Sequence, residues 1–374
     1  MERVDLLGKT KKLVIKVGGS LLLKRDEPDI SFIEKLVESV VQLVEKDKKV
    51  VIVSSGAIAI GREKSGLTAN FISSGAIPSK QALASIGQIH LMQLYFKFFK
   101  KYDLPVGQIL LSAGDLSQRS TYINARNTIL TLLKMGAIPV VNENDTVAVE
   151  EIKFGDNDTL SALVAGLIEA DFLIILSDIQ GLYTSDPKKD PGAKLVSLIN
   201  KIDKKTEKMA LGTCVEGRVG GMQTKIEAAR IATRSGIPVV IGGGEDFLKA
   251  FFSGEKIGTV FLPTESKLQA RKKWIAYGTR TKGIVIVDEG AKKALLQEGS
   301  SLLPVGIKEV RDRFQSGDAV SLLDIKGEEF ARGIVYYSSD ELKKIKGLHT
   351  NEIEAKLGYK YYDEAIHRDN LVIL

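Results

Sequence analysis

A short segment rich in carboxylate and amide side chains stands directly before an apolar run of helix-forming residues. Residues 152–163 read IKFGDNDTLSAL, so Asp156, Asn157 and Asp158 stand where the helix is expected to begin. One interpretation is helix capping, because Asp and Asn are preferred N-cap residues and each acidic group there stabilises the helix by about 0.3–1 kcal/mol. The other is that the start of the helix presents these groups to a ligand.

Two lysines lie next to paired glycines. Lys16 interrupts an apolar run in KVGGS (16–20), and Lys225 ends GGMQTK (220–225). Each lysine alone has an ordinary explanation, as a strand-end side chain that extends to solvent or as part of an exposed helix turn. Paired glycines, however, let backbone N–H groups approach an anion, and a helix N-terminus adds unpaired N–H groups. The two elements together predict a phosphate site.

A second polar cluster, Asn142-Glu143-Asn144-Asp145, follows another apolar run. Such side chains often hydrogen-bond their own backbone in a turn, which is one interpretation. Together with residues 155–158, they would also supply carboxylates and amides suited to an α-amino group or a metal-bound phosphate.

The elements that must position these residues follow an alternating pattern over the first 262 residues. Short, continuous β-branched runs are typical of parallel strands that are buried on both faces. Expected strands cover 12–17, 49–54, 105–112, 137–142, 171–177 and 237–243, and expected helices cover 31–46, 79–101, 124–135, 158–170 and 222–235. This alternation predicts a three-layer αβα sandwich with a mainly parallel sheet.

The polar clusters come at the ends of these strands or open the helices. Ligands of such sheets bind beyond the carboxyl ends of the strands, so the clusters are expected to line one crevice. The sequence lacks G-x-x-x-x-G-K-[ST], and no G-x-G-x-x-G follows the first strand, which argues against P-loop and Rossmann enzymes. Ser54-Ser55-Gly56 is no nucleophile elbow, and His90 falls within a helical pattern, which disfavours a serine hydrolase.

The pattern changes near residue 263. The polar segment 263–274 is expected to be a linker, and short strand-like runs at 283–288, 319–324 and 331–337 predict a small β-rich domain. A basic and aromatic cluster at the junction favours either a solvated linker face or contact with RNA. The cluster consists of Arg271, Lys272, Lys273, Trp274, Tyr277 and Arg280.

Composition narrows the class of protein further. The net charge of +6 is small for a chain of this length, so the charge alone does not indicate nucleic-acid binding. Cys214 is the only cysteine, which excludes internal disulfides and Cys-based zinc sites, and we expect it to be structural. With three histidines in all, a His-based metal site is not expected. No signal peptide or membrane-spanning run is recognised, which predicts a cytoplasmic protein without a membrane partner.

Several motifs, in this order, resemble the amino-acid kinase family, and within it the kinases that act on glutamate: KVGGS, SSGAIAIG, NENDTVAVEEIKFGDNDTLSAL, SDIQGLYTSDP and GGMQTK. The last third, with GIVIVDEGAKKAL, GSSLLPVGIKEV and FQSGDAVSLLD, is similar to a PUA domain, a small pseudo-barrel. The resemblance covers nearly the whole chain. It implies a catalytic domain over 1–262, a linker over 263–274, and a PUA-like domain with a C-terminal extension over 275–374.

The activity implied by the resemblance is transfer of the γ-phosphoryl group of ATP to the side-chain carboxylate of L-glutamate. The product would be L-glutamyl 5-phosphate, the first intermediate of proline synthesis. Lys16 and Lys225 would bracket the phosphoryl group, and Asp158 would orient both. The implied glutamate contacts are Ser55, Gly56, Asn142, Asp145, Asp156 and Asn157. The implied ATP contacts are Lys16, Gly18, Gly19, Ser177, Asp178, Tyr183, Val219, Gly220, Gly221, Met222, Gln223, Thr224 and Lys225.

The chain departs from the family pattern at two positions. Val219 stands where Thr is common, which removes a hydroxyl from the nucleotide site, whereas Ser177 replaces a frequent Thr and keeps one. No dedicated metal site is visible, so Mg²⁺ is expected to be carried mainly by ATP. The family also implies a homo-oligomer, a dimer or a tetramer, and feedback inhibition by proline. The alternatives are another kinase of this family and an RNA-binding role for the C-terminal domain.

Overall fold

The computed structural model describes the chain apart from several short segments. These are residues 1–7, 9, 25–26, 67–76, 148–156, 188, 212–220, 267, 270–271, 273–274, 277–280 and 361. The chain forms two compact units, one of residues 1–117 with 125–265 and one of residues 118–124 with 266–374. The linker predicted over 263–274 lies partly outside the described residues, and its bounds stay a prediction.

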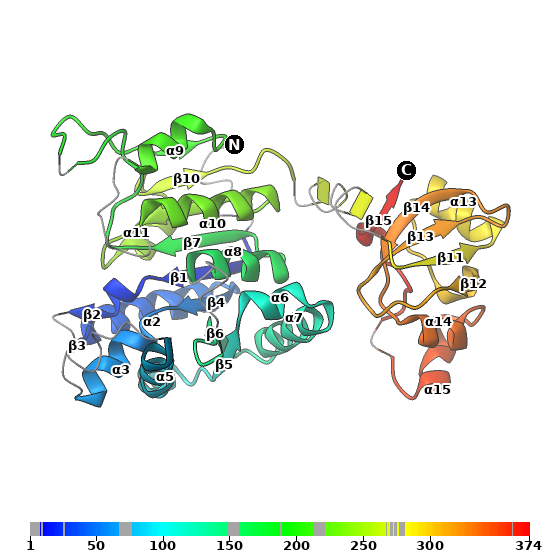
Figure 1. Cartoon of the computed structure of the whole chain (residues 1–374), viewed down its shortest axis with the longest axis horizontal. Coiled ribbons are helices and arrows are strands. Elements are labelled where there is room, and N and C mark those ends of the chain that lie inside the picture. Colours follow the sequence, from blue (N-terminus) through cyan, green and yellow to red (C-terminus); the bar gives the residue numbers. More distant parts are fainter. Residues whose placement is uncertain are drawn as a thin grey trace. The chain divides into compact units, whose positions relative to one another are not determined.

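The first unit contains an eight-stranded sheet with the order β5-β6-β4-β1-β7-β9-β10-β8 (Figure 1). All neighbours from β5 to β9 are parallel, and β10 is antiparallel to β9. The six predicted strands correspond to β1, β4, β5, β6, β7 and β9, whereas β8 and β10 were not predicted. The strands are β1 Lys12–Val17, β4 Lys49–Ser54, β5 Val106–Leu111, β6 Ile138–Glu143, β7 Phe172–Leu176, β8 Leu198–Ile199, β9 Val239–Gly242 and β10 Thr259–Phe261.

Helices lie on both faces of this sheet, because its central strands are apolar on both sides. In β1, the side chains of Leu13, Ile15 and Val17 join one core with α2, α5 and α11. Successive strand residues point to opposite faces, so Lys16 faces the side on which α8 and α10 pack. The helices of this unit are α2 Ile30–Glu45, α3 Ala57–Ser65, α5 Ile77–Phe99, α6 Ala113–Ser117, α7 Arg119–Lys134 from residue 125 on, α8 Asn157–Leu167, α9 Lys204–Leu211, α10 Met222–Arg234 and α11 Phe247–Phe252. The predicted αβα sandwich is therefore confirmed.

The second unit is built on a five-stranded sheet with the order β12-β11-β13-β14-β15. Its strands are β11 Gly283–Val287, β12 Ile307–Arg311, β13 Ala319–Leu323, β14 Glu329–Ile334 and β15 Leu371–Ile373, and its helices are α13 Glu289–Gln297, α14 Ser339–Ile345 and α15 Ile353–Leu357. It has its own core, which includes Val285, Leu322 and Tyr337. The β-rich character predicted for this region is confirmed. Among the described residues of both units, no helix is long and apolar enough to cross a membrane.

Helices α3 and α5 approach each other so closely that glycine is required on both. A Cβ on Gly61 would lie 1.9 Å from the carbonyl oxygen of Leu83, and a Cβ on Gly87 would lie 1.8 Å from that of Ala57. Because both contacts are with backbone, no side-chain rotation can relieve them. This crossing fixes the start of α3, and with it the segment that follows β4.

We therefore expect Gly87→Ala to destabilise the first unit by at least about 2 kcal/mol, since the added methyl group overpacks a backbone contact. Thermal unfolding followed by circular dichroism measures the effect. The matched control is Gly166→Ala in α8, where the Ser235 hydroxyl, at 3.9 Å, is the only atom of the described residues that the new Cβ would meet. There, helix propensity predicts an unchanged or higher melting temperature. Equal responses of the two variants would contradict the close crossing.

Candidate active site

Several of the predicted site residues that the structure describes lie at one edge of the large sheet. Because β1, β4, β6 and β7 run in the same direction, their carboxyl ends meet at that edge. Ser55 and Gly56 follow β4, Asn142 lies near the end of β6, and Ser177 and Asp178 follow β7. Helices α8 and α10 begin at the same edge, with Asn157 and Met222 as their first residues.

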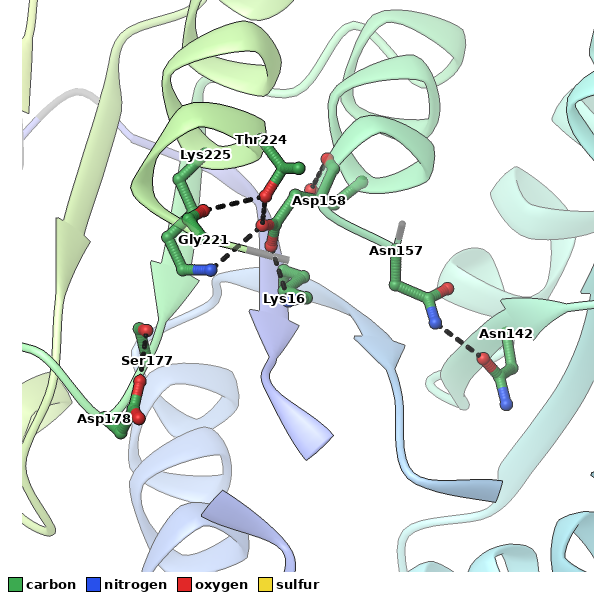
Figure 2. Close-up of polar contacts among 10 residues, drawn as sticks. Lys16, Asn142, Asn157, Asp158, Ser177, Asp178, Gly221, Thr224 and Lys225 are labelled. Atoms are coloured by element: carbon green, nitrogen blue, oxygen red, sulfur yellow. Dashed lines mark hydrogen bonds and ion pairs between the residues drawn. The ribbon is translucent and has the colours of Figure 1, made fainter. Parts of the chain in front are cut away.

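A buried carboxylate between two ammonium groups forms the centre of the site (Figure 2). Asp158 Oδ1 lies 2.5 Å from the Nζ atom of Lys16, and Asp158 Oδ2 lies 3.0 Å from that of Lys225. Asp158, Lys16 and Lys225 are 0%, 4% and 6% exposed, respectively. The structure thus brings together a strand residue, the first turn of α8 and the first turn of α10.

Hydrogen bonds hold Asp158 in place from both helices. The Thr224 hydroxyl lies 3.0 Å from Asp158 Oδ2 and 2.9 Å from the carbonyl oxygen of Gly221, which precedes α10. The Ser161 hydroxyl donates to the backbone carbonyl of Asp158 at 2.6 Å. Thr224 is partly buried and therefore links the start of α10 directly to the carboxylate. The carboxylate position is fixed by covalent geometry and by contacts on two helices.

The electrostatic environment keeps Asp158 ionised. Burial alone would raise the pKa of this carboxyl, but the neighbouring charges of Lys16 and Lys225, together with their hydrogen bonds, lower its pKa below the ordinary value. A carboxylate with a lowered pKa between two ammonium groups is an anchor for those groups and is poorly suited to donate a proton.

Among the described residues, nothing covers the N-terminus of α10, so an anion could approach it there. Gly221 is the N-cap, no side chain caps the helix, and a Cβ on Gly221 would meet no described heavy atom within 4 Å. The first-turn N–H groups of a helix have no partner within the helix and carry partial positive charge. Met222 and Lys225 are buried, whereas the Gln223 side chain is exposed. This end of α10 provides space and N–H donors next to the ammonium group of Lys225.

The paired glycines after β1 pack against two other loops of the site. The Gly18 N–H donates to the carbonyl oxygen of Leu176 at the end of β7, at 3.2 Å. A Cβ on Gly19 would lie 3.4 Å from the backbone nitrogen of Gly56. Gly56 itself has φ 98°, a left-handed conformation that favours glycine. The glycines allow three strand-end loops to approach one another closely.

A chain of side-chain amides lies beside the charged centre. Asn157 Nδ2 donates to Asn142 Oδ1 at 3.1 Å (Figure 2). Asn142 Nδ2 in turn donates to Gln88 Oε1 at 2.8 Å. Asn142 is 1% exposed. Asp145 follows in the same loop, and burial raises the pKa of its carboxyl. The structure therefore connects two of the residues predicted to bind glutamate, through contacts that do not involve the charged centre.

Two residues of α5 take part in this region although no motif indicated them. Gln88 contacts Asn142, and the buried Tyr95 hydroxyl lies 2.9 Å from the hydroxyl of Ser54, the residue before Ser55. Burial raises the pKa of Tyr95 above its ordinary value. In the sequence both residues belong to a long apolar helix pattern, so only the position of α5 against α3 and β4 reveals them.

Some predicted residues lie apart from this centre or outside the described part of the chain. The Ser177 hydroxyl donates to Asp178 at 3.0 Å, and the Tyr183 hydroxyl donates to Gln180 at 3.0 Å, so these side-chain hydrogen bonds are local. Asp156, Val219, Gly220 and Cys214 lie outside the described residues, as do Arg271, Lys273, Trp274, Tyr277 and Arg280. Among the described residues, no three His, Cys, Asp or Glu side chains gather as metal ligands.

An αβα sandwich whose strand and helix ends converge on two lysines and an aspartate defines a class of phosphate-handling protein. Residues 11–243 match the model of the amino acid kinase family, and residues 283–357 match that of the PUA domain. The chain belongs to the amino acid kinase family.

Three relatives are similar to this chain over their full length. A protein named glutamate 5-kinase from Caldanaerobacter subterraneus subsp. tengcongensis is 48% identical over 97% of this chain and 98% of its own. Another of that name, from Syntrophotalea carbinolica, is 47% identical over 99% of both chains. A third, from Dictyoglomus thermophilum, is 48% identical over 97% of this chain and 98% of its own. The resemblance to the amino-acid kinase family with a PUA domain is thereby confirmed.

We expect Asp158→Asn to destabilise the first unit by about 3–5 kcal/mol, because it leaves two buried ammonium groups without their carboxylate. Urea unfolding measures the change. The control is Glu245→Gln, which removes the partner of Lys35 in an exposed ion pair and is expected to cost less than about 1 kcal/mol.

The difference between wild type and Asp158→Asn has a defined pH dependence. Since the folded pKa of Asp158 is lowered, its stabilising contribution is fully present above the unfolded value of about 3.9 and is lost as the pH falls through the folded pKa. The difference in unfolding free energy between the two proteins should be constant from about pH 6 to 8. It should become smaller only below about pH 4. A difference that narrows already near neutral pH would contradict the ion-paired state.

Proposed function

We propose that this chain is an ATP-dependent kinase that phosphorylates the side-chain carboxylate of L-glutamate. The product is L-glutamyl 5-phosphate, an acyl phosphate that enters proline biosynthesis. The observation that carries this proposal is the convergence of Lys16 and Lys225 on Asp158 at the starts of α8 and α10. The full-length similarity to proteins named glutamate 5-kinase supports the choice of acceptor.

The reaction needs positioning and charge stabilisation more than acid–base chemistry. A bond forms between a carboxylate oxygen of glutamate and the γ-phosphorus, and the bond between that phosphorus and the bridging oxygen of ADP breaks. The attacking carboxylate is already ionised, so no general base is required. In phosphoryl transfer, negative charge is spread over the equatorial oxygens of the moving group and develops on the leaving oxygen, and fixed cations stabilise both.

In this mechanism the two lysines bind the phosphoryl group from opposite sides. Asp158 holds their ammonium groups at fixed positions and, with its lowered pKa, stays ionised throughout. The N–H groups at the start of α10 and after Gly18 supply further donors to the phosphates. Preorganised donors of this kind are effective because they need no rearrangement when the charge develops.

The remaining substrate contacts are those that the family resemblance implies. Glutamate is proposed to contact Ser55, Gly56, Asn142, Asp145, Asp156 and Asn157. ATP is proposed to contact Gly18, Gly19, Ser177, Asp178, Tyr183 and residues 219–225. Mg²⁺ is proposed to arrive on the ATP phosphates, where it would neutralise charge on the transferred group. Asp158 is committed to two lysines and is therefore not assigned as a metal ligand.

Several properties expected from the sequence stay predictions. They are the homo-oligomeric state, inhibition by proline, a cytoplasmic location and contact of the PUA domain with RNA. Most of the basic and aromatic cluster on which the RNA interpretation depends lies outside the described residues.

We expect Lys16→Ala and Lys225→Ala each to lower kcat by about 10²–10³, because each removes one preorganised cation from the transition state. Both variants should fold, since Asp158 keeps one ammonium partner in each. ADP release, together with trapping of the acyl phosphate by hydroxylamine, measures turnover. Lys35→Ala, which removes an exposed lysine of the same unit, is the control and should retain wild-type kcat.

Near-normal kcat in both lysine variants would overturn the assigned roles. The acceptor is tested in the same assay with glutamate, aspartate, acetylglutamate and UMP at equal concentrations. Phosphorylation of another acceptor in preference to glutamate would leave the kinase mechanism intact and change only the substrate.

We expect Asp145→Ala to raise the KM for glutamate far more than that for ATP, because Asp145 is proposed to bind the α-ammonium group. Burial raises the pKa of Asp145 above its ordinary value, so in the wild type the KM for glutamate should rise as the pH falls through this raised pKa. In Asp145→Asn this increase in KM should be absent. Only the increase caused by protonation of the side chain of the substrate glutamate should remain, near about pH 4.3. Equal effects on the KM of both substrates would remove Asp145 from the glutamate site.

A further inference from the structure

The amide chain beside the charged centre has a fixed direction. The backbone N–H of Glu143 donates to Asn142 Oδ1 at 2.9 Å. A backbone N–H can only donate, so the Asn142 atom at this position must be the oxygen. Asn142 Nδ2 must then donate to Gln88, and Asn157 must donate to Asn142. One backbone group therefore fixes which end of each of the three amides is oxygen and which is nitrogen. Most side-chain amides have no such fixed reference.

This direction leaves one acceptor and one donor at the two ends of the chain. They are Asn157 Oδ1 and Gln88 Nε2. Both atoms are buried, and within the described part of the structure neither has a hydrogen-bond partner. Buried polar groups are nearly always paired, because an unpaired one costs free energy, so the two atoms call for a partner that the described residues do not supply.

Gln88 lies among the segments assigned to glutamate. Gly87 packs against the carbonyl of Ala57, the residue that follows Ser55 and Gly56, and the Gln88 side chain bonds Asn142. The close α3–α5 crossing thus places Gln88 next to the loop after β4 and beside the end of β6. Asn157 completes the set from the first turn of α8.

We propose that Gln88 is a further substrate-binding residue, whose Nε2 group donates to the α-carboxylate of the amino-acid substrate while Asn157 Oδ1 accepts from its α-ammonium group. An α-amino acid carries one group that only accepts and one that only donates, and the ends of the amide chain match this pair. The proposal rests on the proposed function, since it concerns how the glutamate acceptor is recognised. It also identifies the α-carboxylate as a group the enzyme requires.

The decisive variant is Gln88→Glu. It keeps an oxygen that accepts from Asn142 and replaces the free donor with an oxygen that repels a carboxylate. We expect the KM for glutamate to rise by roughly 10- to 100-fold, as expected when a hydrogen bond to a charged group is lost, with the KM for ATP within about twofold. The matched control is Gln93→Glu, the same change on the exposed face of α5, which should leave both KM values unchanged.

Substrate analogues separate substrate contact from a structural effect. 4-Aminobutyrate is glutamate without its α-carboxylate, and glutarate lacks the α-ammonium group. Measured as competitive inhibitors against glutamate, 4-aminobutyrate should bind Gln88→Glu and wild type equally, whereas glutarate should bind the variant more weakly. If the substitution weakens binding only of compounds that carry the α-carboxylate, the side chain and the carboxylate are energetically coupled. Such coupling is expected of a direct contact.

Two results would overturn the inference. One is a glutamate KM in Gln88→Glu within twofold of the wild type. The other is a variant that binds 4-aminobutyrate more weakly than the wild type does, by the same factor as for glutamate. Gln88 would then be a structural residue only. If Gln88→Glu does not fold, Gln88→Met, which removes both ends of the amide, is tested with the same analogues. The proposed function is tested separately, because it fails only if the wild type does not phosphorylate glutamate.

Discussion

The site depends on a carboxylate that is fully buried between two ammonium groups. Removing three charges from water is costly, and such a cluster persists only where each charge has a partner at hydrogen-bond distance. Here the cluster carries a net positive charge, because two cations share one anion. That excess suits a site whose ligand is a polyphosphate, since the bound anion completes the neutralisation. On the proposed function, the arrangement is therefore more favourable with ATP bound than without it.

The surrounding fold can be understood as the means of bringing these three residues together. Lys16 is on a central strand with apolar neighbours, and the alternation of strand side chains directs it to the face on which α8 and α10 pack. Asp158 and Lys225 come from the first turns of those helices, where the chain has just left the edge of the sheet. The three residues are far apart in the sequence, but they meet in space because the parallel strands end at the same edge of the sheet.

Much of this could be predicted from the sequence, because its signals are local. Continuous β-branched runs indicate the six parallel strands, and the glycine pairs with Lys16 and Lys225 indicate phosphate chemistry. Strand β10, between β9 and β8, is three residues long and antiparallel to β9, so its pattern is too short to recognise. Gln88 and Tyr95 could not be assigned either, because their roles come from the crossing of α5 with α3 and not from their neighbours in sequence.

The acidic and amide-rich segment at the start of α8 serves two functions at once. Consecutive residues of an α-helix point about 100° apart, so Asn157 and Asp158 face different surroundings although they are neighbours. Asp158 turns to the lysines and the proposed phosphoryl group, whereas Asn157 turns to Asn142 and the proposed amino acid (Figure 2). Because one rigid helical turn carries both, the acceptor and the transferred group are held in a fixed relation. Such positioning is the main contribution that a protein makes to phosphoryl transfer.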